Sequence, residues 1–446
     1  MTGSERPATP AGETPASGSL PHWSDGDDVP TITRGEGVRV SDDEGTQFLD
    51  FASQLYCVNA GHSEETIVEA MTEQARRIPY VSSSKHNDAR TELAARLADV
   101  APGDLSGVYF AVSGSEANEA AVQFARAEQD APKVLTRWRS YHGATYGAAA
   151  LTGDPETRAT VERYAATSGS GKFLPPIPAA FDAESPEELT EKAADHLEFV
   201  IRNEGPDSVA ALLMEPVGGT SGAFPAPPGY FERVRDLCDE YDVLLISDEV
   251  ITGFGRCGDW FGIEAEGVQP DMITFAKGVT SAYAPLAGVL VRDSLGASLR
   301  EEGIDVGQTF GGHPVACAAG VAAMDVYEDR LLDNVESVAP TLESELRALN
   351  AHEAVSEVRG RGFLWAVEFA EPETGDPYVD PWAGEGNETD DNPVAAVKEA
   401  AMDAGVLVGG GRPGFQLIVA PPLCADESDV REAVGVLDDA IGEVFG

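Results

Sequence analysis

The sequence has few cysteines and no long apolar run, and each shortage excludes a class of protein. Its five cysteines are widely spaced and form no CxxC pair, which argues against a zinc site and against a disulfide framework. No apolar stretch reaches the roughly 18 residues that a membrane span needs. The N-terminus has neither the basic nor the apolar segment of a secretory signal. We therefore expect a cytoplasmic protein with no metal and no membrane partner.

Basic side chains are also scarce. The 446 residues include 30 Lys and Arg, of which six are lysines, against 77 Asp and Glu, giving a formal net charge of −47. No basic patch is visible, so a nucleic-acid partner is not expected. Such an excess of acid weakens the compact state by self-repulsion at low salt. It therefore favours a halophilic protein whose surface suits a salt-rich cytoplasm.

The hydrophobic pattern predicts a doubly wound α/β domain. Residues 1–30 are rich in Pro, Gly, Ser, Thr and Asp and are expected to be a disordered tail. Residues 31–75 are assigned to a smaller domain, with a hairpin turn at 42–45. Between 76 and 325, short apolar strands alternate with helical segments, which is typical of a mostly parallel sheet covered on both faces. The expected strands are 108–112, 133–136, 209–214, 243–246, 272–275 and 286–291.

The C-terminal part, residues 326–446, has a different pattern. A helical stretch near 314–349 leads into it, residues 355–369 and 405–420 alternate as strands, and 427–444 is expected to be a closing helix. These elements favour a small α+β domain. Between its strands, residues 371–392 are acidic and rich in Pro and Gly, which predicts a surface loop.

Lys277 is the most informative residue of the chain. It ends an apolar run that is expected to form a buried strand, and a buried lysine has a lowered pKa and often a chemical role as an amine nucleophile. The alternative is a lysine at a strand end whose head group reaches water. Asp248 ends a neighbouring apolar run, so both side chains are expected at the carboxyl edge of the sheet. Pyridoxal phosphate needs a lysine for its aldehyde and a carboxylate for its ring nitrogen.

Three further segments are expected at the same edge. Ser113-Gly114-Ser115 follows a strand and opens a helix, so its backbone N–H groups and hydroxyls suit a phosphate, although a simple serine N-cap is the alternative. Tyr141 and His142 follow the next strand, where an aromatic ring can stack on a flat cofactor. Glu215 ends a third strand and is expected near the same crevice.

The segment Gly253–Gly258 matches the GxGxxG pattern of dinucleotide-binding proteins. That fingerprint requires a helix directly after the glycines, and the following residues, Asp259-Trp-Phe-Gly262, predict none. A dehydrogenase is therefore not favoured.

Taken together, these motifs resemble the class-III, pyridoxal-phosphate-dependent aminotransferases of fold type I, from about Val38 to the C-terminus. The resemblance is carried by several motifs in the family's order and spacing. They are Ser113-Gly-Ser-Glu-Ala-Asn118, Tyr141-His-Gly143, Asp248-Glu-Val250, Gly253-Phe-Gly-Arg256, Phe275-Ala-Lys-Gly278 and Thr309-Phe-Gly-Gly-His-Pro314.

The resemblance assigns a role to each matching residue. It implies that Lys277 is the Schiff-base lysine and the proton-transferring base, and that Asp248 is the partner of the pyridine nitrogen. It places Val250 and Tyr141 on the two faces of the ring. Ser113, Gly114, Ser115, His142 and Glu215 complete the expected cofactor-binding set. Thr309 resembles the residue that reaches the phosphate of a neighbouring subunit, which implies a homodimer with shared sites, and the dimers could pair into a tetramer. Arg412 stands where the family binds a substrate carboxylate.

The branch of the family is indicated by one departure and by two segments that resemble another branch. The branch that uses 2-oxoglutarate, such as the 4-aminobutyrate transaminases, has a glutamate where this chain has Thr220. The segment Leu55–Asn59 and the Trp260-Phe-Gly262 segment resemble the ω-amino acid and amine:pyruvate transaminases, with Tyr56 as an expected substrate contact. We therefore expect amino transfer from an ω-amino acid or a primary amine to pyruvate. The alternatives are a 4-aminobutyrate-type enzyme that uses 2-oxoglutarate, an aminomutase or epimerase, and a non-catalytic binding protein of the same fold.

Overall fold

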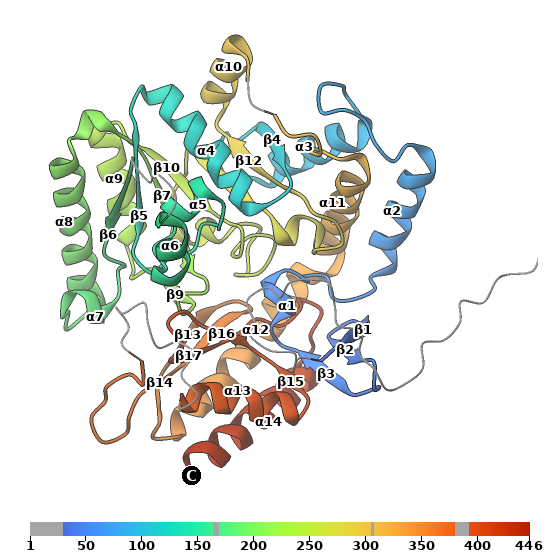
Figure 1. Ribbon diagram of the computed structural model, residues 1–446, viewed down its shortest axis with the longest axis vertical. Helices are drawn as coiled ribbons and strands as arrows, with labels where there is room; N and C mark the ends of the chain where they lie inside the picture. Colours follow the sequence, from blue (N-terminus) through green and yellow to red (C-terminus); the bar gives the residue numbers. More distant parts are fainter. Residues whose placement is uncertain (1–29, 164–168, 305–306, 380–391) are drawn as a thin grey trace, which may run out of the picture.

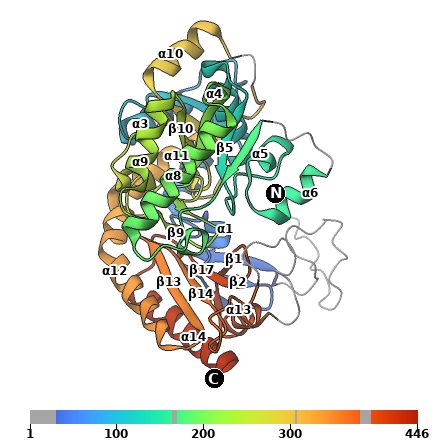
Figure 2. The same cartoon turned by 90° about the vertical axis from the view of Figure 1, so that its left-hand side faces the viewer.

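The computed structural model describes residues 30–163, 169–304, 307–379 and 392–446. The expected disordered tail and most of the expected acidic loop at 371–392 lie outside these ranges. Within them, no helix combines the length and the apolar character that crossing a membrane requires. The described residues form a large lobe built on one wide sheet and a smaller lobe that contains the C-terminus (Figures 1 and 2).

The large lobe contains a seven-stranded sheet with the strand order β4-β12-β11-β10-β7-β5-β6. Strand β12 is antiparallel to both of its neighbours, and the other pairs of the sheet are parallel. This confirms the expected mostly parallel, doubly wound sheet. The strands are β4 (Gly107–Ala111), β5 (Lys133–Arg137), β6 (Ser170–Phe173), β7 (Val209–Met214), β10 (Leu244–Asp248), β11 (Met272–Phe275) and β12 (Ala287–Val291).

Alternate residues of these strands face two different hydrophobic layers. Leu245 packs in a layer with helices α3, α8, α9 and α11, whereas its neighbours Leu244 and Ile246 pack in a layer with α4, α5 and α10. Both faces of the sheet are therefore covered, which is why its strands are continuously apolar rather than alternating. The covering helices are α3 (Asp88–Val100), α4 (Gly114–Gln129), α5 (Tyr146–Leu151), α8 (Pro186–Glu204), α9 (Tyr230–Tyr241), α10 (Asp293–Glu302) and α11 (Pro314–Val326).

The smaller lobe combines strands from both ends of the chain. One sheet has the order β1-β2-β3-β15, in which β3 (Gln47–Asp50) pairs in parallel with β15 (Val406–Leu407). The expected hairpin joins β2 (Arg39–Asp42) to β3, and Asp42 Oδ1 closes its turn by accepting from Thr46 N at 2.8 Å. The first strand is β1 (Ile32–Glu36).

The second sheet of this lobe has the order β13-β14-β17-β16 and packs against three helices. Its strands are β13 (Val355–Arg361), β14 (Leu364–Phe369), β16 (Gly409–Gly410) and β17 (Gln416–Val419). The helices are α12 (Leu332–Ala348), α13 (Pro393–Asp403) and α14 (Glu427–Phe445).

The remaining α-helices and strands of the described residues lie outside these three sheets. They are α1 (Ser53–Tyr56), α2 (Glu65–Arg77), α6 (Pro155–Glu162), α7 (Pro178–Phe181), β8 (Val217–Gly218) and β9 (Phe224–Pro225).

The glycine-rich segment 253–258 joins the two lobes instead of opening a helix. It forms a loop with no α-helix directly after it, as the sequence predicted, and a 3-10 turn, Gly262–Glu266, comes next. The Arg256 side chain is fully buried and donates to Asn59 Oδ1 at 2.9 Å and to the Phe363 carbonyl at 3.2 Å. A segment of the large lobe is thereby held to both the N-terminal and the C-terminal parts of the chain.

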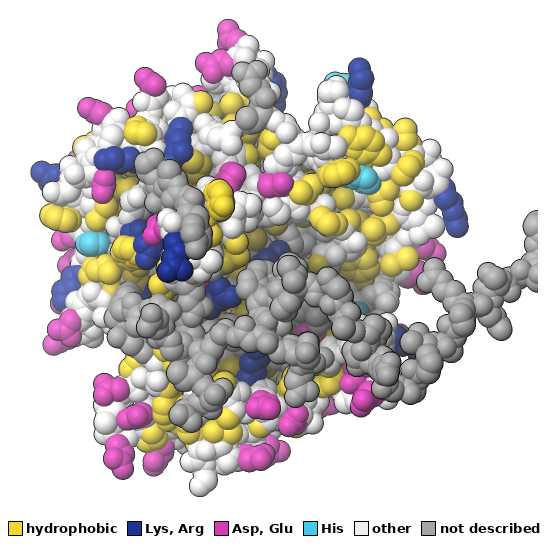
Figure 3. Space-filling view, viewed as in Figure 1, with side chains coloured by type: hydrophobic (Ala, Val, Ile, Leu, Met, Phe, Trp, Pro, Cys, Tyr) yellow, Lys and Arg dark blue, Asp and Glu magenta, His cyan; other side chains and the backbone are white. Residues whose placement is uncertain are grey.

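Acidic side chains are spread over the surface of both lobes. Figure 3 shows Asp and Glu distributed across this face instead of concentrated in one patch. With a formal net charge of −47, neighbouring carboxylates on such a surface repel one another.

Candidate active site

The carboxyl ends of the parallel strands converge on one cavity of about 360 Å³, within the range of small-molecule sites. Its walls come from the large lobe, from the α1 segment and from the loop around β16. The residues that line it include Tyr56, Gly114, Ser115, Asn118, Tyr141, His142, Glu215, Thr220, Asp248, Val250, Lys277, Lys398 and Arg412. Most of the site residues predicted from the sequence are therefore brought together. Ser113 and Thr309 are not among the residues that line this cavity.

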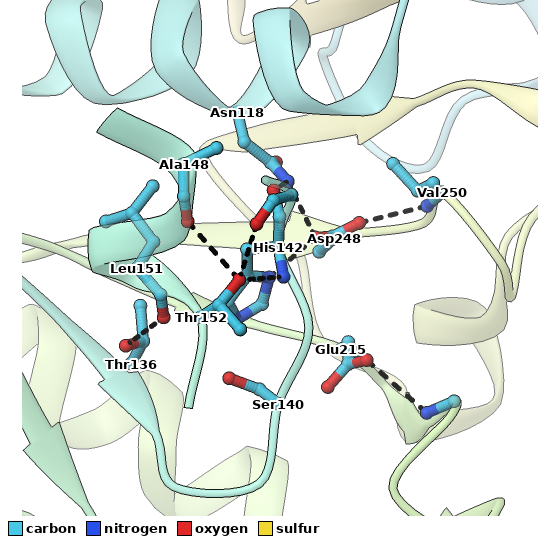
Figure 4. Close-up of polar contacts among 12 residues, drawn as sticks. Asn118, Thr136, Ser140, His142, Ala148, Leu151, Thr152, Glu215, Asp248 and Val250 are labelled. Carbon is cyan, nitrogen blue, oxygen red and sulfur yellow. Dashed lines mark hydrogen bonds and ion pairs between the residues drawn. The ribbon is translucent and has the colours of Figure 1, made fainter. Parts of the chain in front are cut away.

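Asp248, the last residue of β10, is held by three hydrogen bonds (Figure 4). Its Oδ2 accepts from Asn118 Nδ2 at 2.9 Å and lies 2.7 Å from His142 Nδ1. Its Oδ1 accepts from the backbone N–H of Val250 at 3.1 Å. Only 3% of the residue is exposed, so the carboxylate is fixed in one orientation at the base of the cavity.

The tautomer of His142 follows from its surroundings. Its side chain is buried, and Nε2 has no hydrogen-bond partner among the described residues. A proton on Nε2 would be buried and unpaired, which is costly. The 2.7 Å contact between Nδ1 and Asp248 Oδ2 is therefore assigned to a proton on Nδ1, which donates to the carboxylate. Its backbone is held by Thr152 Oγ1, which accepts from His142 N at 2.9 Å.

Lys277 does not lie in a strand, which corrects the prediction from the sequence. Strand β11 ends at Phe275, and Lys277 begins a one-turn 3-10 helix, Lys277–Thr280, with a φ of +47°. This left-handed conformation is strained for a lysine. It is held in place by a hydrogen bond from Ala282 N to the Lys277 carbonyl at 3.1 Å. The turn directs the lysine to the cavity, where Nζ lies 5.7 Å from the centre of the Tyr56 ring.

The surroundings of Lys277 favour its neutral form. Burial lowers the pKa of its amine, and the nearby Cys57, Asp248 and Glu215 oppose that effect only in part. Because β10 and β11 are adjacent parallel strands, with Asp248 beside Thr274, the lysine and the aspartate reach the same cavity. An amine with a lowered pKa and a fixed carboxylate are thereby presented to one ligand.

The start of α4, where an anion cradle is expected, borders the cavity through Gly114 and Ser115. The simple serine N-cap given as the alternative is present, and the capping residue is Ser113 and not Ser115, because Ser113 Oγ accepts from Glu116 N at 3.3 Å. Ser115 is instead free to face the cavity, and its Oγ accepts from Ala144 N at 3.3 Å. A Cβ on Gly143, whose φ is +129°, would lie 2.4 Å from Ser115 Oγ, so this approach requires glycine.

Val250 and Tyr141 both line the cavity, as expected for residues on two faces of a ring. A Cβ on Gly114 would lie 3.1 Å from both methyl groups of Val250. The glycine therefore lets the start of α4 approach the residue that is expected to cover one ring face. Burial raises the pKa of Tyr141, which keeps its hydroxyl protonated at neutral pH.

Glu215 is buried beside a partner that the sequence did not indicate. Its Oε2 lies 3.0 Å from Arg137 Nη2, and 1% of the arginine side chain is exposed. Burial raises the pKa of Glu215, while Arg137 opposes this effect. The arginine thus compensates a carboxylate that would otherwise be unpaired below the cavity.

Tyr56 forms part of the cavity wall through an unusual backbone. Ser53, Gln54 and Tyr56 all have positive φ values, of 43°, 60° and 59°. The buried Asp50 stabilises this strained segment by accepting from Gln54 N at 3.0 Å. Conformational strain of this kind is found where a site must hold a side chain in place.

Arg412 also lines the cavity and has an acidic partner. Its Nη1 lies 3.3 Å from Asp154 Oδ2 and donates to Thr157 Oγ1 at 3.2 Å. Its backbone N–H donates to the Thr220 carbonyl at 2.8 Å. Lys398, an exposed residue of α13, also lines the cavity. Sequence reasoning missed Asp154, Thr157 and Lys398, because no motif marks them and only the tertiary fold brings them here.

Thr309 is exposed and belongs to a different surface of the chain. Its carbonyl accepts from Tyr80 Oη at 3.0 Å, and the Tyr80 ring packs edge-on against Phe310 at 6.1 Å. Within one chain it therefore makes no contact with the cavity. Its expected role in a neighbouring subunit stays a prediction.

The donor set of the cavity fits pyridoxal phosphate. A buried carboxylate, a lysine amine and an anion cradle at a helix N-terminus are the three groups that this cofactor requires. Asn118 Oδ1 and His142 Nε2, both buried and without a partner among the described residues, show that the polar wall can take further hydrogen bonds. The described ranges contain no cluster of His, Cys, Asp and Glu suited to a metal ion.

Comparison with known proteins finds the family that the sequence motifs resemble, and the match covers most of the chain. The family model of the class-III aminotransferases matches residues 24–441. A probable aminotransferase of Mycobacterium tuberculosis is 38% identical over 90% of this chain and 87% of its own length. The putrescine–pyruvate aminotransferase of Pseudomonas aeruginosa is 34% identical over 90% of this chain and 88% of its own.

A solved structure extends the similarity to the fold. The taurine:2-oxoglutarate aminotransferase of Bifidobacterium kashiwanohense, in complex with pyridoxal phosphate and glutamate, superposes with a TM-score of 0.89 at 33% identity. The match covers 95% of each chain. These similar proteins thus include one named for pyruvate and one named for 2-oxoglutarate.

Proposed function

The chain belongs to the class-III aminotransferases, which use pyridoxal phosphate, and on this premise we propose that it moves an amino group from an ω-amino acid or a primary amine to pyruvate. The observation that carries the proposal is the composition of the cavity. Its lining includes the Lys277 amine, the fixed carboxylate of Asp248 and one arginine, Arg412.

The cofactor supplies an electron sink for the carbanion that forms when the donor loses its α-proton. We assign the proton transfer to Lys277 Nζ, which burial biases toward the neutral, proton-accepting form. We assign the protonated state of the cofactor ring nitrogen to Asp248, whose carboxylate is held by Asn118 and His142. Tyr141 and Val250 would orient the ring from its two faces.

The preference for pyruvate is supported by the wall around Arg412. Thr220 lines the cavity and carries no charge where the glutamate-using branch has a carboxylate. Leu55, Ile251 and Val408 add apolar surface to the same cavity, which suits a donor without a second acidic group. Pyruvate has one carboxylate, so one guanidinium satisfies it.

One observation favours 2-oxoglutarate as the acceptor instead. Lys398 is a second cationic side chain of the cavity, and a second cation suits the distal carboxylate of a diacid. The similarity to a taurine:2-oxoglutarate aminotransferase is compatible with this alternative. The choice between the two acceptors therefore depends on whether Lys398 contacts the substrate.

Competing steady-state measurements with pyruvate and 2-oxoglutarate distinguish these possibilities. We expect kcat/KM to be at least about tenfold higher with pyruvate, which corresponds to ~1.4 kcal/mol. Lys398→Met should leave the pyruvate reaction nearly unchanged. Lys192→Met is the matched control, because Lys192 pairs with Glu188 at 2.8 Å on α8. A preference for 2-oxoglutarate that is lost in Lys398→Met would instead establish the alternative.

We also propose a homodimer that shares its active sites. The support is the exposed aromatic cluster next to Thr309, in which Tyr80 is 42% and Phe310 is 57% exposed. Exposed apolar side chains that gather in one place are typical of protein interfaces.

The acidic surface described above supports a further proposal, that the protein is located in a salt-rich cytoplasm.

A further inference from the structure

Asp154 is the partner of Arg412, which lines the cavity, and its position is fixed by the start of helix α6. Its Oδ2 accepts from Thr157 N at 3.1 Å and from Thr157 Oγ1 at 2.7 Å, so it is the helix N-cap. Its own N–H donates to the Ser140 carbonyl at 2.9 Å. The preceding Gly153 has no room for a side chain, because a Cβ would lie 2.0 Å from the Arg137 carbonyl.

Arg412 is held much less firmly than Asp154. Its side chain is 29% exposed, whereas that of Asp154 is 4% exposed. Its contacts to Asp154 and Thr157, at 3.3 and 3.2 Å, are longer than the roughly 2.7–2.9 Å of a strong charge-assisted hydrogen bond. The arginine can therefore leave the aspartate at little cost, and the aspartate stays in place when it does.

We infer that Asp154, assisted by Thr157, is the counter-ion that holds Arg412 at the cavity wall when a carboxylate-free amine is bound, and that a substrate carboxylate must compete with it. The inference rests on the proposed role of Arg412 as the carboxylate-binding residue. It supplies from α6 the negative charge that Thr220 does not supply. Asp154 is then a specificity-determining residue, because it sets the balance between donors with and without a carboxylate.

The charges of the site require such a partner. An arginine beside an apolar donor tail would be desolvated and unpaired, which costs free energy. Asp154 removes this cost when the substrate has no carboxylate. When the substrate has a carboxylate, Arg412 exchanges the carboxylate of Asp154 for that of the substrate. The apparent affinity for the substrate is then reduced in proportion to the fraction of protein in which Arg412 is not paired with Asp154.

The test compares binding and turnover in Asp154→Asn. Asparagine is as good an N-cap as aspartate, so α6 keeps its cap while the charge is lost. Propionate has a carboxylate but no amine, so its affinity for the holoenzyme can be measured by calorimetry without turnover. If Arg412 is paired for nine-tenths of the time, Asp154→Asn should bind propionate about tenfold more tightly. The same variant should use 1-phenylethylamine about tenfold less well in kcat/KM of the first half-reaction.

Two further variants complete the experiment. Asp426→Asn makes the same change at another N-cap, where Oδ1 accepts from Ser428 N at 2.7 Å on α14, and it should alter neither quantity. Thr157→Val removes the hydroxyl that Arg412 contacts. It should change the affinity for propionate and the kcat/KM for 1-phenylethylamine in the same directions as Asp154→Asn does, but by a smaller factor.

The outcomes separate the inference from the function on which it rests. Opposite shifts for propionate and for the amine in Asp154→Asn support it. Unchanged or weakened propionate binding in that variant overturns it. If Arg412→Ala binds propionate as tightly as the wild type, the proposed carboxylate role of Arg412 fails, and the inference fails with it. If Arg412→Ala loses binding while Asp154→Asn matches the wild type, only the counter-ion role is lost.

Discussion

His142 Nδ1 lies 2.7 Å from Asp248 Oδ2, and this contact determines which oxygen of the carboxylate remains available for a further hydrogen bond. Oδ2 also accepts from Asn118, so it already has two partners. Oδ1 has one, the backbone N–H of Val250. A carboxylate oxygen can accept about two hydrogen bonds. Oδ1 is therefore the atom that we expect to meet the ring nitrogen of the cofactor.

Asp248→Asn should abolish most of the turnover while the cofactor stays bound. The change preserves the shape of the side chain and removes the charge that favours a protonated ring nitrogen. We expect kcat to fall by about 10³-fold or more, or ~4 kcal/mol in the barrier. Asp259→Asn, an exposed residue outside the cavity, is the matched control. Single-turnover kinetics within about tenfold of the wild type would exclude the proposed role of Asp248.

The pH dependence of Lys277 should differ from that of an exposed lysine. Burial lowers its pKa below the ordinary 10.5, so its neutral, reactive fraction rises at a lower pH. Lys192 is the internal control, because its hydrogen bond to Glu188 raises its pKa. In the cofactor-free protein, an amine-reactive reagent should label Lys277 with a lower pH midpoint than Lys192, as measured by peptide mass spectrometry. Equal midpoints, or the reverse order, would contradict the prediction.

Thr309 should act in the cavity of a neighbouring subunit. Mixing Lys277→Ala with Thr309→Val subunits would create hybrid dimers in which one site has its own Lys277 and the partner's intact threonine. For random pairing this restores about a quarter of the native sites. The measurement is activity at limiting cofactor after the mixed subunits are reassembled. If the mixture is no more active than the two separate variants, Thr309 does not act across the interface.

Stability should rise with salt. The net charge of −47 gives strong self-repulsion, which salt screens over a few ångströms at molar concentration. The thermal midpoint of unfolding, measured by calorimetry from low to molar KCl, should increase. A midpoint that is constant or falls would contradict the halophilic interpretation.

The sequence predicted the large sheet well because its strands are buried on both faces. Runs such as Val209–Met214 are continuously apolar and therefore visible without any structure. Strand β6 was missed, because its sequence, Ser-Gly-Lys-Phe, is short and polar and pairs only at the sheet edge. Lys277 was placed near the correct strand, but the positive φ that follows β11 has no signal in the sequence.

The sequence predicted those residues of the candidate site that lie at the ends of neighbouring strands. Asp248 ends β10, and Lys277 follows the adjacent parallel strand β11 by two residues, so sheet topology brings the two residues to the same edge. The pairing of Asp154 with Arg412 could not be predicted, since 258 positions separate the two residues and neither lies in a strand of the large sheet. The sequence indicated only that Thr220 replaces the glutamate of the 2-oxoglutarate branch. The structure places a different carboxylate, that of Asp154, 3.3 Å from Arg412 Nη1.

The parallel pairing of β3 with β15 has a consequence for how the protein is made. Ser53 Oγ donates to the Ala420 carbonyl, across 367 positions of the chain. A ribosome therefore releases every strand of the large sheet before β3 can find its partner. The large sheet can assemble during synthesis, because domains fold as their residues emerge. The cavity, whose wall includes Tyr56 and Arg412, can close only after the last strands have been translated. Early fragments should therefore collapse without gaining the ability to retain cofactor.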